Sequence, residues 1–260
     1  HPRPGHADYT ASVRYNGAND IRGGGHFSGR LTACLVFAGA VCRQILERRG
    51  ITIGAHAYAV GSAKDTPFDP VNVSKDDLNA LNTRFFAVNS PEAEEKMRAE
   101  IEAARLDADS IGGIIECAAV GVPAGIGSPM FGGIENVFAS ILYGIPAVKG
   151  VEFGAGFDVA CMRGSENNDA FYYDENGFVR TKTNNAGGIL GGITNGMPVE
   201  FEVCIRPTPS IAQPQQTVDL VQRKDAELTI TGRHDPCILH RALPVIEAAA
   251  ALAACQLMDL

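Results

Sequence analysis

Residues 197–206, MPVEFEVCIR, alternate between apolar and polar side chains. That alternation is typical of a β-strand with one face on a core and the other face in water. Two further stretches, ITIGAHAYAV at 51–60 and IGGIIECAAV at 111–120, are almost continuously apolar and indicate buried strands. Residues 147–163 also have strand character. These four segments predict the sheet on which the fold is built.

Helical patterns lie between and beside the strands. The run from Ser28 repeats apolar residues at helical spacing and stops before Gly50, a residue suited to the position after a helix. Ser90-Pro91-Glu92 supplies a capping hydroxyl, a first-turn proline and an early acid, which predict a helix that reaches about Leu106. Further helices are expected over 134–144 and from 244 to 260.

Strands and helices intermingle without strict βαβ alternation, so the expected fold class is α+β. No linker or internal repeat divides the chain, and we expect residues 1–260 to form a single domain. Residues 61–90 are predicted to be loops and short turns. Residues 164–186 are polar and are predicted to be a flexible excursion.

Composition excludes several classes of protein. A net charge of −8 argues against nucleic acid as a partner, because a phosphate backbone requires a basic face. The seven cysteines are odd in number and dispersed, without a Cys-x-x-Cys pair, which indicates reduced thiols and a cytoplasmic location. We expect no bilayer span, since no apolar stretch is both long enough and uninterrupted enough, and no spacing of His and Cys predicts a metal site.

Three segments have a composition that is unusual for segments with a purely structural role. The first joins Arg3-Pro4-Gly5-His6 to the glycine-rich run 22–30, which ends at Arg30 in the first turn of a helix. A cation there opposes the helix dipole and is costly unless an anion binds nearby. Either Arg30 is a surface arginine beside a flexible loop, or it belongs to an anion site.

The second segment, NNAGGILGGITNG at 184–196, has paired glycines that suit either a structural bend or close approach to a flat ring. The third, GRHDPC at 232–237, is followed by Arg241 and is either a salt-bridged helix start or a proton-transfer and anion-binding cluster. His56 and His240 are better explained as structural histidines.

Taken together, these segments resemble the chorismate synthase family. The motifs RPGHADY (3–9), HFSGR (26–30), NNAGGILGG (184–192) and GRHDPC (232–237) follow in that family's order. The stretches GVPAGIG, AVKGVEFGAGFDVA and RPTPSI between them also fit, so the likeness covers nearly the whole chain. The chain starts at His1 and lacks the family's Gly-Glu-Ser-His-Gly motif, so we expect it to begin within a longer protein.

The resemblance implies a β-α-β sandwich, a homotetramer and a specific reaction. Members eliminate phosphate and a ring proton from 5-enolpyruvylshikimate 3-phosphate in an anti-1,4 sense to give chorismate, the last step of the shikimate pathway to the aromatic amino acids. The reaction requires reduced FMN, with NADPH as a candidate reductant of the flavin. A non-catalytic flavin- or phosphate-binding homologue, or an inactive truncated form, is the alternative.

Residue roles carried over from the family are expectations for matching positions of this chain. His6 would protonate or stabilise the reduced flavin, and Asp235 would assist proton removal. Arg3, Arg30 and Arg233 would bind the substrate's anionic groups, since guanidinium binds carboxylate and phosphate in a bidentate manner. The flavin would contact the following residues: His26, Phe27, Ser28, Pro146, Ala147, Gly191, Arg206, Pro207, Thr208, Pro209, Ser210 and Arg233.

Overall fold

The expected strands pair in one antiparallel sheet. A computed structural model describes all residues 1–260, and its main sheet has the strand order β2-β1-β3-β9-β4. The central strands coincide with the three quoted apolar and alternating segments, which confirms those predictions. The strands are β1 Thr52–Val60, β2 Ala63–Lys64, β3 Gly113–Val120, β4 Val148–Phe153 and β9 Val199–Ile205.

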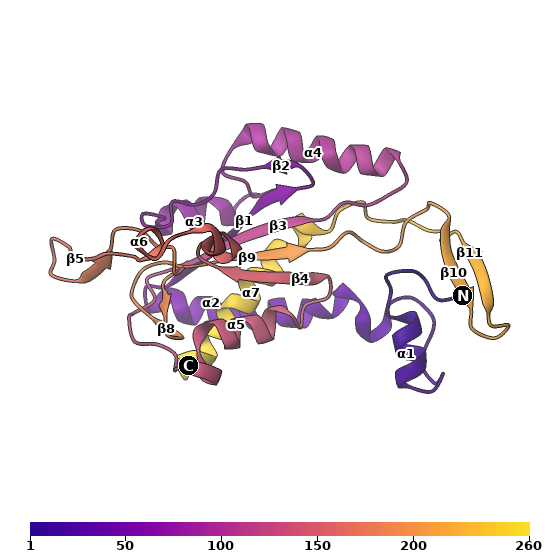
Figure 1. The fold of residues 1–260 in the computed structure, drawn as a ribbon, viewed down its shortest axis with the longest axis horizontal. Helices are drawn as coiled ribbons and strands as arrows, with labels where there is room; N and C mark the ends of the chain where they lie inside the picture. Colours follow the sequence, from indigo (N-terminus) through magenta and orange to yellow (C-terminus); the bar gives the residue numbers. More distant parts are fainter.

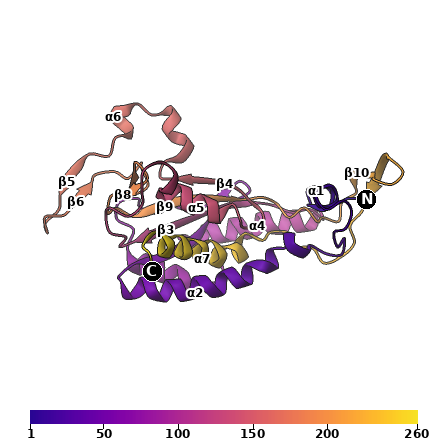
Figure 2. The ribbon, with the colours of Figure 1, turned by 90° about the horizontal axis from the view of Figure 1, so that it is seen from below.

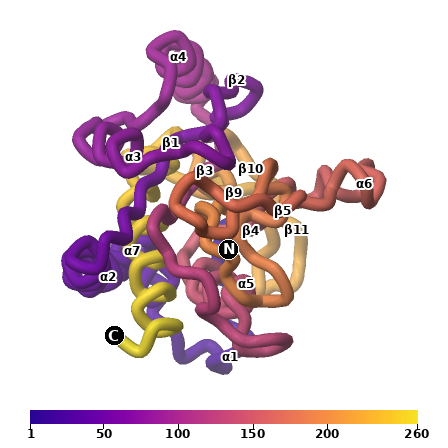
Figure 3. The backbone as a smooth tube through the Cα atoms, turned by 90° about the vertical axis from the view of Figure 1, so that its left-hand side faces the viewer, coloured from indigo at the N-terminus to yellow at the C-terminus, as the bar shows by residue number.

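One face of this sheet is covered by helices. The alanine-rich helix α7, Leu239–Leu257, packs on β1 and β3, while α5, Ile134–Leu142, packs beside it under β4. Helix α2, Thr32–Arg48, lies outside α7 and forms the outermost layer (Figures 2 and 3). The predicted helix boundaries near Gly50, Leu106 and 134–144 are confirmed.

The remaining elements surround this body of one sheet and two helix layers. Figure 1 shows the β10–β11 hairpin beside the N-terminus at one end and the β5–β6 hairpin at the other. The helices are α1 Asp8–Arg14, α3 Lys75–Asn82, α4 Pro91–Leu106, α6 Gly164–Asn167, with 3-10 turns η1 Gly25–Phe27, η2 Gly29–Leu31, η3 Met130–Gly132 and η4 Gly156–Cys161. The short strands are β5 Phe171–Tyr173, β6 Val179–Thr181, β7 Ile189–Leu190, β8 Ile193–Thr194, β10 Gln215–Asp219 and β11 Lys224–Leu228.

Four of the predictions for individual segments were wrong or incomplete. Residues 61–90 contain the helix α3, whose capping box of Ser74 and Asp77 is a signal that could have revealed it. Residues 164–186 form α6 and the β5–β6 hairpin rather than a flexible excursion. Strand character in 147–163 ends at Phe153, and η4 follows. Helix α7 begins at Leu239, with Pro244 inside it.

The polar side chains of β9 are less exposed to solvent than the alternating pattern predicts. Glu200 is only 6% exposed, and Glu202 is half-buried. Asn184 donates from Nδ2 to the carbonyls of Pro70 at 2.9 Å and Pro198 at 3.0 Å, which holds Pro70 beside the start of this strand. The polar side chains of β9 therefore lie under a covering segment, which alternation within the strand cannot reveal.

The α2–α7 interface depends on a helix-interior glycine. A Cβ added to Gly39 would lie 2.3 Å from the Cβ of Ala248 and 2.5 Å from its Cα, so only glycine lets the two helix backbones approach this closely. Together, η2 and α2 form an apolar helical span, Gly29–Arg48, that by length and composition could cross a membrane. That corrects the expectation that no stretch is long enough, although the same helix packs on α7.

We expect Gly39→Ala to lower the free energy of unfolding by about 1–3 kcal/mol, because overpacking against α7 outweighs the better helix propensity of alanine. Urea unfolding followed by circular dichroism measures the change.

Gly164→Ala is the matched control, because a Cβ at that helical position meets nothing within 4 Å. It should leave stability unchanged or slightly raised. A Gly39→Ala protein as stable as the parent would show that α2 and α7 are not closely packed at this point.

Candidate active site

The N-terminal motif and the 206–210 turn meet although they are separated by about 200 residues in the chain. His6 Nε2 lies 3.0 Å from Ser210 Oγ, and Arg206 Nη1 donates to the carbonyl of Gly5 at 2.7 Å. Both contacts join residues that the sequence motifs had marked separately. They bring an imidazole, a guanidinium and a hydroxyl to one place at the end of β9.

Backbone geometry explains why these residues meet. Gly5 has a φ of +71°, and a Cβ there would lie 3.0 Å from that of Pro209, so glycine is required on both counts. The amide of Arg206 donates to the carbonyl of Ala147 at 3.0 Å, which adds Pro146 and Ala147 to the same neighbourhood. Ser110 Oγ donates to the carbonyl of Thr208 at 2.6 Å and fixes the turn from its other side.

Charges around His6 favour its neutral form. Burial lowers the pKa of His6 below its ordinary value of 6.5, and the nearby Arg3 and Arg206 lower it further, while Asp8 opposes them. The imidazole therefore carries one ring proton at neutral pH, and it can either donate to or accept from Ser210.

Arg3 is held by a partner that sequence reasoning missed. Its Nε and Nη2 donate to the carboxylate of Asp8 at 2.7 and 2.8 Å, and Nη2 also donates to the carbonyl of Gly23 at 2.7 Å. The hydrogen bonds from Arg3 lower the pKa of Asp8. Asp8 stands in the same RPGHADY motif, so an Arg–Asp pair five residues apart was the available signal. The contact with Gly23 ties α1 to the glycine-rich run.

The residues after that run form two successive 3-10 turns. His26 and Phe27 lie in η1, and Phe27 is exposed. Ser28 Oγ accepts the amide of Arg30 at 3.2 Å, so Ser28 caps η2, whereas α2 itself begins at Thr32 without a side-chain cap. Arg30 is exposed at the start of α2. His26, Phe27 and Arg30 are exposed and Ser28 is half-buried, and none of these side chains makes a hydrogen bond to the His6 group.

Three other expected residues, Asp235, Arg233 and Gly191, make no hydrogen bond to His6, Arg206 or Ser210. Asp235 pairs with Arg241 at 2.8 Å, at the entrance to α7, and Arg233 is exposed two residues earlier. Gly191 lies in the β7–β8 turn, and β8 is at the opposite end of the molecule from α1 in Figures 1 and 2. The structure thus gathers His6, Arg206 and Ser210 but leaves Gly191 apart.

The hydroxyl of Thr208 is an orphan polar group within the gathered turn. Thr208 Oγ1 is buried and has no hydrogen-bond partner in the protein. A buried hydroxyl without a partner is costly, which favours a ligand atom or a water at this position. Thr208 therefore marks the turn as a place where a polar ligand group can be bound.

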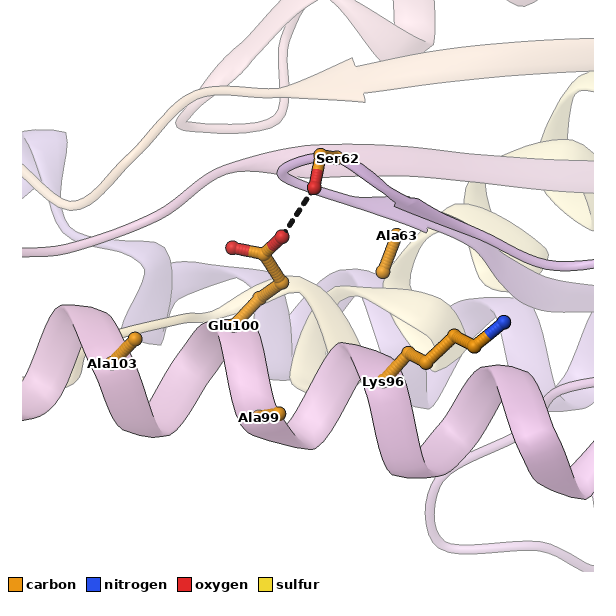
Figure 4. Close-up of a pocket in the computed structure, with 6 residues that line it drawn as sticks. All are labelled: Ser62, Ala63, Lys96, Ala99, Glu100 and Ala103. Carbon is orange, nitrogen blue, oxygen red and sulfur yellow. Dashed lines mark hydrogen bonds between the residues drawn. The ribbon is translucent and has the colours of Figure 1, made fainter.

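A surface pocket of about 440 Å³ lies between α4 and the β1–β2 turn, and none of the expected site residues lines it. Figure 4 shows Glu100 of α4 pointing to Ser62, whose hydroxyl donates to it, with Lys96 farther along the helix. No group of three or more His, Cys, Asp or Glu side chains is arranged to hold a metal ion.

Comparison with known proteins identifies the family. A family model described as chorismate synthase matches residues 1–259. Relatives named chorismate synthase from Korarchaeum cryptofilum and Thermococcus gammatolerans are 49% and 51% identical over 95% of this chain, which spans 67% of each relative.

A solved structure supports the same assignment. The crystal structure of a chorismate synthase superimposes with a TM-score of 0.77 at 27% identity, over 97% of this chain and 70% of that one. This likeness confirms the expected α+β class and the fold type. By extent of match, identity and shape alike, this chain belongs to the chorismate synthase family.

Proposed function

We propose that the protein is a phosphate lyase that converts 5-enolpyruvylshikimate 3-phosphate to chorismate. The reaction is an anti-1,4-elimination, in which the C–O bond to phosphate breaks and a ring proton is lost. Family membership over residues 1–259 supports this activity. The observation that carries it in the structure is the meeting of His6, Arg206 and Ser210 at the end of β9.

Reduced FMN is the proposed cofactor. When bound, it supplies electron density to an elimination that is redox-neutral overall. The gathered residues suit such a group, because the 206–210 turn combines the Arg206 guanidinium with the unpaired buried hydroxyl of Thr208. Pro146 and Ala147 lie against the same turn through the bond from Arg206 to Ala147. His26, Phe27 and Ser28 would supply a second wall.

His6 is proposed to hold and transfer a proton beside the cofactor. A neutral imidazole can do both at neutral pH, and the depressed pKa of His6 favours that form. Ser210 Oγ orients the ring through its contact with Nε2. Arg206 would stabilise negative charge near the ring.

We propose further roles for three residues outside the His6 group: Asp235, Arg233 and Arg30. Asp235 would assist removal of the substrate's ring proton, and its pairing with Arg241 would have to loosen for this role. Arg233 and Arg30 are exposed cations free to bind carboxylate or phosphate. Arg3 would contribute by holding α1 against the glycine-rich run, and its charge would add to the field at the site.

The cellular setting remains part of the proposal. We propose a cytoplasmic homotetramer that takes a small-molecule substrate and uses NADPH, directly or through a separate reductase, to reduce its flavin. Net charge −8 and seven free cysteines support a reducing compartment without nucleic acid as a partner. The alternative is a flavin- or phosphate-binding homologue without catalysis.

We expect the protein with photoreduced FMN under anaerobic conditions to release phosphate from 5-enolpyruvylshikimate 3-phosphate. His6→Ala and Asp235→Ala should each lower kcat by at least about 100-fold, as expected for loss of a proton-transfer group. Phosphate release and chorismate absorbance measure the rate.

Asp225→Ala, an exposed acid on β11, is the control and should retain the parent rate. Equal rates in all three variants would remove the assigned roles of His6 and Asp235. Flavin binding without phosphate release by the parent would favour the non-catalytic alternative.

The charge field at His6 gives a separate prediction. Arg206→Gln should raise the pKa of His6 toward 6.5, because one of the cations that lower it is removed, while burial keeps the pKa below 6.5. NMR of the His6 ring protons against pH measures the change. Arg233→Gln should leave this pKa unaltered, and a shift of equal size in both variants would contradict the assigned effect of the Arg206 charge on the His6 pKa.

A further inference from the structure

A row of ionisable side chains crosses the main sheet, and the proposed reaction uses none of them. In the strand register, His56 on β1 lies opposite Glu116 on β3, Glu116 opposite Glu202 on β9, and Glu202 opposite Glu152 on β4. Four neighbouring strands thus place one titratable group each in a single line on one face. Three of the four are glutamates, and like charges directly opposite are destabilising.

His56 is fully buried between two carboxylates. Its Nδ1 lies 3.0 Å from Asp65 Oδ2, and its Nε2 lies 2.6 Å from Glu116 Oε2. An imidazole can donate at both nitrogens only when it is protonated. Burial alone would lower the pKa of His56, but the hydrogen bonds to both carboxylates outweigh it and raise the pKa. Both ring nitrogens face carboxylate oxygens, and this geometry favours the imidazolium form.

The same two carboxylates fasten backbone segments to the sheet. Asp65 accepts the amides of Asn89 and Ser90, at 2.5 and 2.9 Å, immediately before α4. Glu116 accepts the amide of Phe68 at 2.9 Å. The imidazolium between them ties the entry to α4 and the 65–68 segment to β1 and β3.

Glu200 and Glu202 are the acids of this face whose ionised forms are disfavoured. Glu200 is 6% exposed, points to the same face as Glu202, and its Oε1 has no hydrogen-bond partner. Burial, with Glu116 and Asp69 nearby, raises the pKa of Glu200 to about 8. Burial, with Glu116 and Glu152, raises the pKa of Glu202 to about 7, while Lys64 and His56 oppose the rise.

The remaining charged groups do not balance these acids. Tyr58 on β1 and Asp158 on η4 face the same cluster. Burial raises the pKa of Tyr58, and the charges of Glu202, Glu116 and Asp158 raise it further. Lys64 on β2 is exposed, so its charge is screened by water. When both Glu200 and Glu202 ionise, the one buried imidazolium faces an excess of carboxylates.

We propose that this row is a pH-sensitive latch. With Glu200 and Glu202 protonated, it keeps residues 65–68 and the entry to α4 closed on the sheet, and it loosens them as the two acids ionise. A locally opened segment hydrates these acids and restores their ordinary acidity, so opening becomes easier as pH rises between the ordinary and the folded values. Loss of the His56 proton at higher pH acts in the same direction.

Hydrogen exchange by NMR or mass spectrometry tests the latch on the whole protein. Between pH 6 and pH 8.5, protection factors of the Phe68, Asn89 and Ser90 amides, corrected for intrinsic exchange, should fall at least about tenfold, the effect of one pKa unit. Amides of the β1–β3 ladder should change much less. In Glu200→Gln/Glu202→Gln the fall should be at least about threefold smaller than in the parent, since neither of these side chains can ionise and only the His56 proton is still lost.

Glu175→Gln, an exposed acid at the β5–β6 turn, is the matched control and should behave as the parent. Parent protection that stays constant across this pH range would overturn the latch. So would a fall of the same size in the double variant. Each single variant, Glu200→Gln and Glu202→Gln, should show a fall in protection between those of the parent and the double variant. The melting temperature is a second measure, and in these variants it should depend less on pH than in the parent.

Discussion

The pairing of β9 with β3 on one side and β4 on the other is the constraint on which the rest of the structure depends. β9 ends at Ile205, so the sheet itself delivers Arg206 to the start of the 206–210 turn. The amide of Arg206 then bonds to Ala147, immediately before β4. Two segments that the motifs marked separately are thus brought together by the sheet register rather than by side-chain recognition.

Arg206 extends this constraint to the N-terminal motif. Its guanidinium reaches the carbonyl of Gly5, and the left-handed conformation of Gly5 turns His6 toward Ser210. A residue with a Cβ at position 5 would be strained and would press on Pro209. The imidazole is therefore positioned by backbone contacts, which hold a catalytic group more firmly than a flexible side-chain pair would.

Much of the fold could be predicted from local patterns, because strands such as 51–60 and helices such as 91–106 bury apolar residues at regular spacing. The burial of Glu200 could not, since it depends on a covering segment more than 100 residues away. Motif order indicated His6 and the 206–210 turn as parts of one site. Only the tertiary structure reveals that Asp235 is paired with Arg241 and that Gly191 lies at the other end of the molecule.

The two faces of β9 show why polar residues are tolerated inside this sheet. Phe201, Val203 and Ile205 pack against the helix layer, where α7 contributes an almost uninterrupted run of buried alanines. Glu200 and Glu202 point the other way, toward the face on which the 65–70 segment, α3 and η4 lie. An acid buried under a loop can regain water when the loop opens, whereas an acid buried under α7 could do so only by disrupting the core. Ionisation on this face therefore favours local opening over global unfolding, and the strand that carries Arg206 can keep its pairing while the loops beside it move.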